Sequence, residues 1–195
     1  AEVKIAGDGE ICMRGRHVFR GYYKDSAGTA DVLDADGWLY SGDIGELDAG
    51  GFLQITDRKK DLIITAGGEN VAPQLVEGYL KSIPVVSQAV VLGDRQRYLG
   101  ALITLDPVQL IEEARAADSP ARDPASAAAC EKFRAHLQRH IDAVNARLAR
   151  VQAVKRFEIV PREFTVEGGE LTPSLKVRRR AVAEKYAAHI ARLFA

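Results

Sequence analysis

Residues 57–70 read Asp57-Arg58-Lys59-Lys60-Asp61-Leu62-Ile63-Ile64-Thr65-Ala66-Gly67-Gly68-Glu69-Asn70. A charged cluster leads into a short apolar strand, and a glycine pair then predicts a turn. By composition alone, this pattern is typical of a solvated charge run followed by a hairpin. The stretch is decisive because the character of the chain changes within it, from β-rich before Lys60 to mixed α and β after it.

Upstream, residues 1–59 carry the signals of short strands joined by tight turns. The apolar run Ile11–Met13 and the partly alternating Phe52–Ile55 predict strands, and the segments between them are rich in Asp and Gly. We therefore predict a β-rich segment over 1–59, followed by a separate α+β unit over 60–195.

Downstream, helical and strand patterns alternate. Pro73 is suited to the first position of a helix, and Asp106-Pro107 and Asp123-Pro124 predict two further helix starts. Apolar residues three and four apart predict one helix from Phe133 to Val151 and a terminal helix over 182–193. Strands are expected at 62–64, 85–92, 99–105 and 157–160, so the fold class is α+β.

Charge and composition exclude several functional classes. Among 195 residues, Lys+Arg and Asp+Glu both number 27, so no global field attracts nucleic acid or an anionic membrane. The basic run Arg178 to Arg180 lacks the interleaved aromatic residues that stack on single strands. No apolar run approaches the roughly 20 residues that span a bilayer. The chain starts without Met, directly in a strand-like segment, so we expect a piece of a longer protein.

Metal and cysteine chemistry have weak signals. Cys12 and Cys130 are far apart and form no CxxC motif, which favours a reduced compartment and no structural zinc. His136 and His140 are four residues apart, a spacing that can bind metal on a helix, but the sequence reveals no acidic or cysteine third ligand. We therefore predict no metal site and interpret the two histidines as a half-buried pair.

Two segments contain candidate functional residues. Gly37-Trp38-Leu39-Tyr40-Ser41-Gly42-Asp43 places an acidic residue after tight glycine turns, where a carboxylate can accept hydrogen bonds from a vicinal diol. Leu171-Thr172-Pro173-Ser174-Leu175-Lys176 places a lysine on a loop that leads into a helix. Taken separately, the first is also typical of a plain turn and the second of a basic helix start.

The order of these motifs is more specific than any one of them. Gly37-Trp38 with Gly42-Asp43, then residues 57–70, then Pro173 with Lys176 and Arg179 resemble the later motifs of the adenylate-forming superfamily. That superfamily comprises acyl-CoA synthetases, peptide-synthetase adenylation domains and luciferases. The resemblance covers most of the chain and implies the end of a large AMP-binding domain (1–59) followed by a small mobile carboxy-terminal domain (60–195).

The resemblance also implies residue roles. Asp43 is similar to the ribose-binding aspartate and Arg58 to a nucleotide-contacting arginine. Lys60 matches the hinge between the two domains. Gly67-Gly68 resembles the turn that lines the pantetheine tunnel, and Lys176 matches the adenylation lysine.

Two local forms narrow the substrate class. Thr-Pro-Ser-Leu-Lys, with Leu175 where many relatives have Gly, and Ile-Thr-Ala-Gly-Gly-Glu-Asn-Val resemble long-chain and bubblegum-type acyl-CoA synthetases. The implied reaction activates a fatty acid with ATP and Mg²⁺ and passes the acyl group to CoA, in the cytoplasm, with peripheral membrane contact left open. The chain contains no Ser/Thr/Gly-rich phosphate loop and no Tyr-Gly-x-Thr-Glu element, so we expect the missing large domain to supply the acyl pocket and the Mg²⁺ ligand, and the isolated chain to be inactive.

Other interpretations remain open from the sequence. A fatty acyl-AMP ligase would use a carrier protein's pantetheine in place of CoA. A non-catalytic nucleotide-binding or interaction module is a second alternative, and nucleic-acid binding through Arg178 to Arg180 is a distant third.

Overall fold

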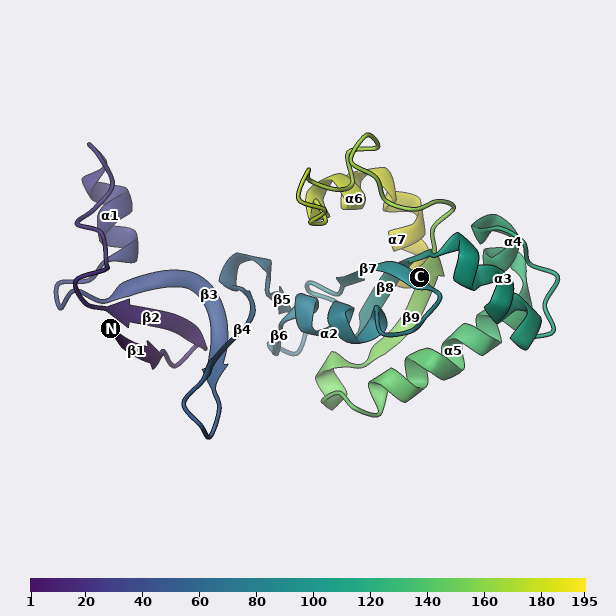
Figure 1. Cartoon of the computed structure of the whole chain (residues 1–195), viewed down its shortest axis with the longest axis horizontal. Coiled ribbons are helices and arrows are strands. Elements are labelled where there is room, and N and C mark those ends of the chain that lie inside the picture. The colour runs from purple at the N-terminus through teal and green to yellow at the C-terminus, as the bar shows by residue number, and fades with distance from the viewer. The chain divides into compact units, whose positions relative to one another are not determined.

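The computed structural model describes residues 1–195, which divide into two compact units, Ala1–Leu62 and Ile63–Ala195 (Figure 1). The first unit is built mainly of strands and the second mixes helices with a three-stranded sheet. The predicted α+β class, with its β-rich part first, is confirmed.

The first unit contains a four-stranded antiparallel sheet whose strands pair in sequence order, β1-β2-β3-β4. Ile11 and Cys12 of the second strand are buried in its core, as their apolar run predicts. The chain leaves the last strand through a short 3₁₀ turn, η1 (Lys59–Asp61). The other elements are β1 (Glu2–Ile5), β2 (Glu10–Arg14), α1 (Ser26–Val32), β3 (Leu39–Leu47) and β4 (Leu53–Arg58).

The second unit opens with a small hairpin and continues into a three-stranded sheet. The hairpin consists of β5 (Ile63–Ile64) and β6 (Asn70–Val71). In the sheet, β7 (Val86–Leu92) pairs antiparallel with β8 (Leu99–Leu105), which pairs parallel with β9 (Val154–Ile159). A parallel pair requires a long crossover, and the helices between β8 and β9 provide it.

Helices cover both faces of this sheet, and the residues of β8 are therefore buried on each side. Ala101 and Ile103 of β8 pack in one cluster with residues of α2 (Pro73–Leu80) and α5 (Glu131–Asn145). Leu102 packs in a second cluster with residues of two carboxy-terminal helices. Successive strand residues point to opposite faces, so the alternation in β8 supports two separate cores. The remaining helices are α3 (Pro107–Ala116), α4 (Pro124–Ala129), α6 (Arg179–Lys185) and α7 (Ala187–Leu193), with a 3₁₀ turn η2 (Arg150–Gln152).

The helices begin where the capping residues predict, whereas two helices are shorter than the apolar spacing predicts. Asp106 and Asp123 cap α3 and α4 through hydrogen bonds from backbone N–H groups. The helix predicted to run from Phe133 to Val151 ends at Asn145, because the Asn145 amide exchanges hydrogen bonds of 2.8 and 2.9 Å with the backbone of Val154. Leu148 and Val151 still pack against the core, so their apolar spacing reflects burial rather than helix.

The predicted terminal helix is likewise two helices. The chain breaks at Tyr186, with φ −108° and ψ 26°, between α6 and α7. The hydroxyl of Tyr186 donates a hydrogen bond to the buried carboxylate of Glu170 at 3.2 Å. The apolar spacing continues across the break because both short helices pack on the same cluster.

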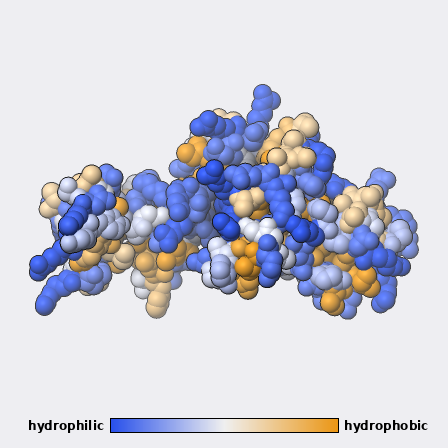
Figure 2. All heavy atoms as spheres, turned by 90° about the horizontal axis from the view of Figure 1, so that it is seen from above, coloured by the Kyte–Doolittle hydropathy of each residue, from blue (hydrophilic) through white to orange (hydrophobic).

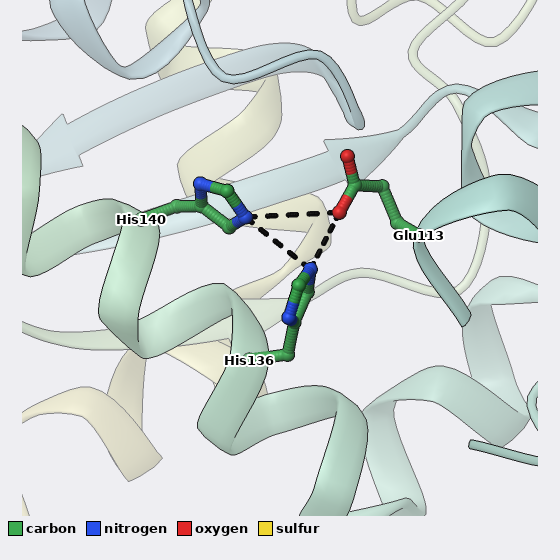
Figure 3. Close-up of side chains that lie close together, drawn as sticks. All are labelled: Glu113, His136 and His140. Carbon is green, nitrogen blue, oxygen red and sulfur yellow. Dashed lines mark hydrogen bonds and ion pairs between the residues drawn. The ribbon is translucent and has the colours of Figure 1, made fainter. Parts of the chain in front are cut away.

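The fold supplies a neighbour that the sequence pattern of the histidines lacks. His136 and His140 lie on α5, and Glu113 of α3 points toward both of them (Figure 3). The Glu113 Oε2 atom lies 2.5 Å from His136 Nε2 and 3.7 Å from His140 Nε2. The sequence reveals no acidic neighbour for these histidines, and the packing of α3 against α5 supplies one, Glu113.

Figure 2 shows a face on which hydrophilic residues predominate and apolar ones lie in separate patches. None of the helices is both long enough and apolar enough to cross a membrane.

Candidate functional site

Asp43 and Arg58 are direct cross-strand partners in β3 and β4. The Nε atom of Arg58 lies 2.8 Å from the Oδ1 atom of Asp43. The Asp43 side chain is 24% exposed and that of Arg58 is 56% exposed. The antiparallel register therefore brings together two residues that the sequence suggested separately, and leaves both accessible from solvent.

Both residues line an open cleft of about 700 Å³ in the first unit. Aromatic and polar groups share the lining, which includes Phe19, Tyr22 and Tyr40. A cleft with flat apolar rings and a half-buried carboxylate can hold a planar base and a sugar diol.

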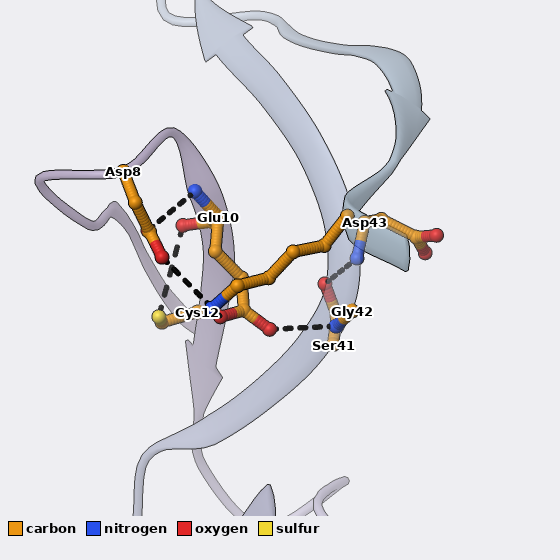
Figure 4. Close-up of polar contacts among 7 residues, drawn as sticks. Asp8, Glu10, Cys12, Ser41, Gly42 and Asp43 are labelled. Atoms are coloured by element: carbon orange, nitrogen blue, oxygen red, sulfur yellow. Dashed lines mark hydrogen bonds and ion pairs between the residues drawn. The ribbon is translucent and has the colours of Figure 1, made fainter. Parts of the chain in front are cut away.

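A network of polar contacts lies beside this cleft (Figure 4). The ammonium of Lys59 contacts Asp8 Oδ2 and Glu10 Oε2, each at 2.8 Å. Hydrogen bonds to Asp8, and to a lesser extent to Glu10, raise the pKa of Lys59. The hydrogen bond that Lys59 donates to Asp8 lowers the pKa of Asp8. Glu10 is only 4% exposed, so this pairing compensates a buried carboxylate.

The second carboxylate oxygen of Glu10 holds the chain just before Asp43. Gly42 N donates to Glu10 Oε1 at 2.8 Å, and Gly42 has φ +73°, a conformation that favours glycine. The Asp43 carboxylate points away from Glu10 (Figure 4). Sequence reasoning missed Asp8, Glu10 and Lys59 as supports; the Gly9-Glu10 dipeptide and the charge cluster were the available signals.

The glycine pair forms the tip of the β5–β6 hairpin. Gly68 N donates to Thr65 O at 2.9 Å, and Thr65 N donates to Glu69 O at 3.0 Å. Gly67 and Gly68 are exposed, and a Cβ atom added to Gly68 would meet no heavy atom within 4 Å. The tip therefore presents backbone to solvent, while Ala66 N is anchored by Gln96 O at 2.9 Å.

Lys176 lies exposed on a tight loop between the buried residues Glu170 and Leu171 and helix α6. Leu171 and Val177 form a bridge, and Thr172 N donates to Lys176 O at 2.8 Å. Lys176 N donates in turn to Thr172 Oγ1 at 3.1 Å. The loop backbone is thus fixed while the lysine side chain extends into solvent.

Leu175, just before the lysine, has φ +60° and is 66% exposed. A left-handed conformation is strained for a branched side chain, because Cβ approaches the following carbonyl. Glycine would adopt this conformation without strain, which accounts physically for a Gly-Lys pair at this point. Leu175 meets the same backbone requirement at a steric cost.

The loop is anchored on its carboxy-terminal side by a partly buried ion pair. Arg179 Nη2 lies 2.6 Å from Glu77 Oε1 of α2, and Arg179 Nη1 donates to Val91 O of β7 at 3.2 Å. The same Glu77 oxygen accepts from Val91 N at 2.7 Å. These contacts connect the start of α6 to both α2 and the sheet.

Lys60 lies exposed in the η1 turn, at the end of the first unit. Asp43 and Arg58 belong to the first unit, whereas Gly67, Gly68 and Lys176 belong to the second.

Residues 60–195 match the family described as AMP-binding enzyme C-terminal domain. The chain belongs to this family. The hairpin and the Lys176 loop lie inside the matched range of this AMP-binding enzyme C-terminal domain, and the Asp43–Arg58 pair precedes it.

Curated relatives of this domain are longer proteins. The long-chain-fatty-acid–CoA ligase FadD15 of Mycobacterium tuberculosis is 40% identical over 194 residues, which are 98% of this chain and 32% of that ligase. The long-chain-fatty-acid–CoA ligase ACSBG1 of Mus musculus is 39% identical over 198 residues, covering 92% of this chain and 28% of that ligase. The chain thus spans about a third of the length of such relatives.

Two solved structures of enzymes share the fold. The A-PCP didomain of carboxylic acid reductase from Segniliparus rugosus, in complex with AMP, superimposes with a TM-score of 0.70 at 28% identity. That match covers 96% of this chain and 25% of the didomain. The amide bond synthetase McbA from Marinactinospora thermotolerans gives a TM-score of 0.65 at 27% identity, covering 95% of this chain and 34% of that enzyme.

Proposed function

We propose that this chain is the carboxy-terminal part of a long-chain fatty acid–CoA ligase and that Lys176 is its adenylation lysine. The supporting observation is an exposed lysine on an anchored loop in a chain that is 40% identical to such a ligase across nearly its whole length. In this proposal residues 1–59 end the large AMP-binding domain and residues 60–195 form the small mobile domain.

In the first half-reaction, a carboxylate oxygen of the fatty acid attacks the α-phosphorus of ATP, and pyrophosphate leaves. Asp43 accepts hydrogen bonds from the ribose hydroxyls, and Arg58 approaches the nucleotide from the adjacent strand. The Lys176 ammonium lies between the carboxylate and phosphate oxygens, where it offsets their repulsion and stabilises charge in the transition state.

In the second half-reaction, the small domain turns about Lys60 and Lys176 withdraws. The Gly67-Gly68 tip then lines the path of pantetheine, where a side chain would obstruct it. The CoA thiol loses its proton, its sulfur attacks the acyl carbonyl carbon, and AMP leaves as the thioester forms. One domain thereby serves both steps through a hinge motion.

Mg²⁺ would assist the first step by neutralising phosphate charge. The carboxylates of Glu10 and Asp43 beside the cleft are paired with Lys59 and Arg58, so they do not offer an open Mg²⁺ site. We assign no step to Mg²⁺ through these residues. We place the Mg²⁺ ligand in the preceding large domain and the working enzyme in the cytoplasm, with any membrane contact peripheral.

The acceptor is tested by product analysis with the full-length protein. Fatty acid, ATP and CoA should give acyl-CoA and AMP. Transfer only to the pantetheine of a carrier protein, with no acyl-CoA formed, would contradict the proposal and identify a fatty acyl-AMP ligase instead. Isothermal titration of the isolated chain with AMP and CoA separates weak nucleotide binding from none.

Asp43→Asn in the full-length enzyme should raise KM for ATP by about 10- to 100-fold, because hydrogen bonds to a charged acceptor contribute about 1.5–3 kcal/mol. KM for the fatty acid should stay nearly unchanged. Steady-state kinetics with each substrate varied in turn measures both. Asp36→Asn, an exposed acid in the same unit, is the matched control. An unchanged KM for ATP would exclude ribose binding by Asp43.

Lys60→Pro should slow thioester formation by roughly tenfold or more, with a smaller effect on adenylation, since proline fixes φ and restricts the proposed hinge. Single-turnover assays of each half-reaction measure the two effects. Lys60→Ala is the control, because it removes the ammonium and keeps the backbone free. Equal slowing of both half-reactions by Lys60→Pro would contradict the hinge assignment.

A further inference from the structure

Glu113, His136 and His140 form a compact cluster on the helical layer of the second unit (Figure 3). His136 and His140 are one helical turn apart on α5, and Glu113 comes from α3, 23 residues before His136. All three side chains direct one ligand atom to a common point, and these atoms lie within 4.8 Å of one another. Nothing in the proposed acyl transfer uses them.

The distances suit a small cation. The three ligand atoms are separated by 2.5 Å (Glu113–His136), 3.2 Å (His136–His140) and 3.7 Å (Glu113–His140). Ligands about 2.0–2.2 Å from a tetrahedral Zn²⁺ lie ~3.3 Å from each other, within the range of these three separations. An ion therefore fits with side-chain shifts of a few tenths of an ångström to just under one.

Burial and packing favour a preorganised site. The side chains of His136 and Glu113 are 12% and 17% exposed, which limits competition from water. Their helical neighbours Leu137 and Ala114 are fully buried in the core that joins α3 to α5. His140 is 38% exposed and leaves one side open, as required for a water molecule in a fourth position.

The two imidazoles converge on one carboxylate oxygen. Two imidazole Nε2 atoms approach the same Glu113 oxygen and lie 3.2 Å from each other. A shared cation would bind all three atoms at once. Two imidazoles with one carboxylate favour Zn²⁺, whereas Mg²⁺ and Ca²⁺ prefer oxygen ligands only.

Arg139 contacts the other ring nitrogen of His136. Its Nη2 atom lies 3.1 Å from His136 Nδ1. A guanidinium can only donate, so Nδ1 accepts, and the proton of neutral His136 resides on Nε2, facing Glu113. A metal on Nε2 requires that proton on Nδ1 instead. Arg139 is exposed on the helix surface and can swing away, so its contact with His136 opposes metal binding.

We propose that Glu113, His136 and His140 form a Zn²⁺-binding site that links α3 to α5. The site lies next to Ala114 and Leu137, which pack in the cluster that covers one face of the β7-β8-β9 sheet. Leu171 and Val177 of the lysine loop pack in the cluster on the other face. Its role is therefore structural or regulatory and separate from the lysine that we assign to adenylation. Ion binding to the folded state stabilises the fold by mass action.

The test is zinc titration of the metal-free 195-residue chain by calorimetry, with a chelator as competitor. We expect one ion per chain, a rise in Tm with zinc, and the visible absorption of tetrahedral cobalt when Co²⁺ replaces zinc. Glu113→Gln, His136→Gln and His140→Gln should each weaken binding by at least about 100-fold, because even second-shell changes cost 10- to 100-fold. His189→Gln, which removes a histidine of α7, should bind as the wild type does.

Arg139→Gln separates this site from surface binding. It should tighten zinc binding several-fold, because the guanidinium, which can only donate to His136 Nδ1, is replaced by an amide that can also accept from an Nδ1–H group. The melting temperature of each metal-free variant shows that it is folded. The proposal is overturned if the wild-type chain binds no stoichiometric zinc, if binding survives in the three ligand variants, or if Arg139→Gln weakens it.

Discussion

Lys176→Ala in the full-length ligase should lower the rate of acyl-adenylate formation by about 10²- to 10³-fold, the usual effect of removing one preorganised charge-stabilising group. The reason is positional. The loop backbone is held by the Leu171–Val177 bridge and by Arg179, while the lysine side chain is exposed. Loss of the ammonium should therefore remove catalysis without disturbing the fold.

The measurement is pyrophosphate release in single turnover, followed by a separate assay with supplied acyl-adenylate and CoA. Thioester formation in the second assay should be nearly unchanged, because Lys176 has withdrawn by then. Arg180→Ala is the control, since Arg180 is a neighbouring exposed base that forms an ion pair with the surface residue Glu184. Adenylation by Lys176→Ala at the wild-type rate would contradict the assignment of Lys176 as the adenylation lysine.

Glu170→Gln should destabilise the second unit by about 3 kcal/mol at neutral pH. Burial raises the pKa of Glu170, but hydrogen bonds from Lys185, backbone N–H groups and Tyr186 outweigh it and lower the pKa to about 2. The carboxylate is fully buried, with Lys185 Nζ at 2.6 Å and Arg162 Nη2 at 3.3 Å. Removing its charge leaves two cations without their partner.

The sign of the pH effect follows from the lowered pKa. The unfolded carboxyl titrates near its ordinary value of 4.5, so the stabilisation is complete above that pH and is lost as the pH falls toward about 2. The difference in unfolding free energy between wild type and Glu170→Gln should therefore be largest at neutral pH and shrink between about pH 4.5 and 2.

Urea unfolding of the 195-residue chain tests this with an internal reference. Trp38, the single tryptophan, lies in the first unit, whereas most helical residues lie in the second. The far-ultraviolet helical signal should shift in Glu170→Gln while the Trp38 signal stays in place. Glu184→Gln, on an exposed pair with Arg180, should change stability by no more than about 1 kcal/mol. An equal shift for both variants would contradict a stabilising role for the ion pairs of Glu170.

Local sequence patterns anticipated much of the second unit. The starts of α3 and α4 follow from Asp106 and Asp123, because an Asp side chain caps a helix from within its own segment. The ends of helices could not be predicted in the same way. Asn145 terminates α5 through Val154 and Tyr186 breaks the terminal helix beside Glu170, and both partners are set by packing.

The sequence by itself determined the α+β class and the order of the family's motifs, because these depend on residue type and spacing, and the resemblance of those motifs to a known superfamily singled out Asp43, Arg58 and Lys176 as candidates. Tertiary structure alone decided the Asp43–Arg58 ion pair, the support of Gly42 by Glu10, and the meeting of Glu113 with His136 and His140. Strand register and helix packing bring together residues that are distant in the chain. One-dimensional spacing carries no information on such contacts, and here they orient the candidate groups.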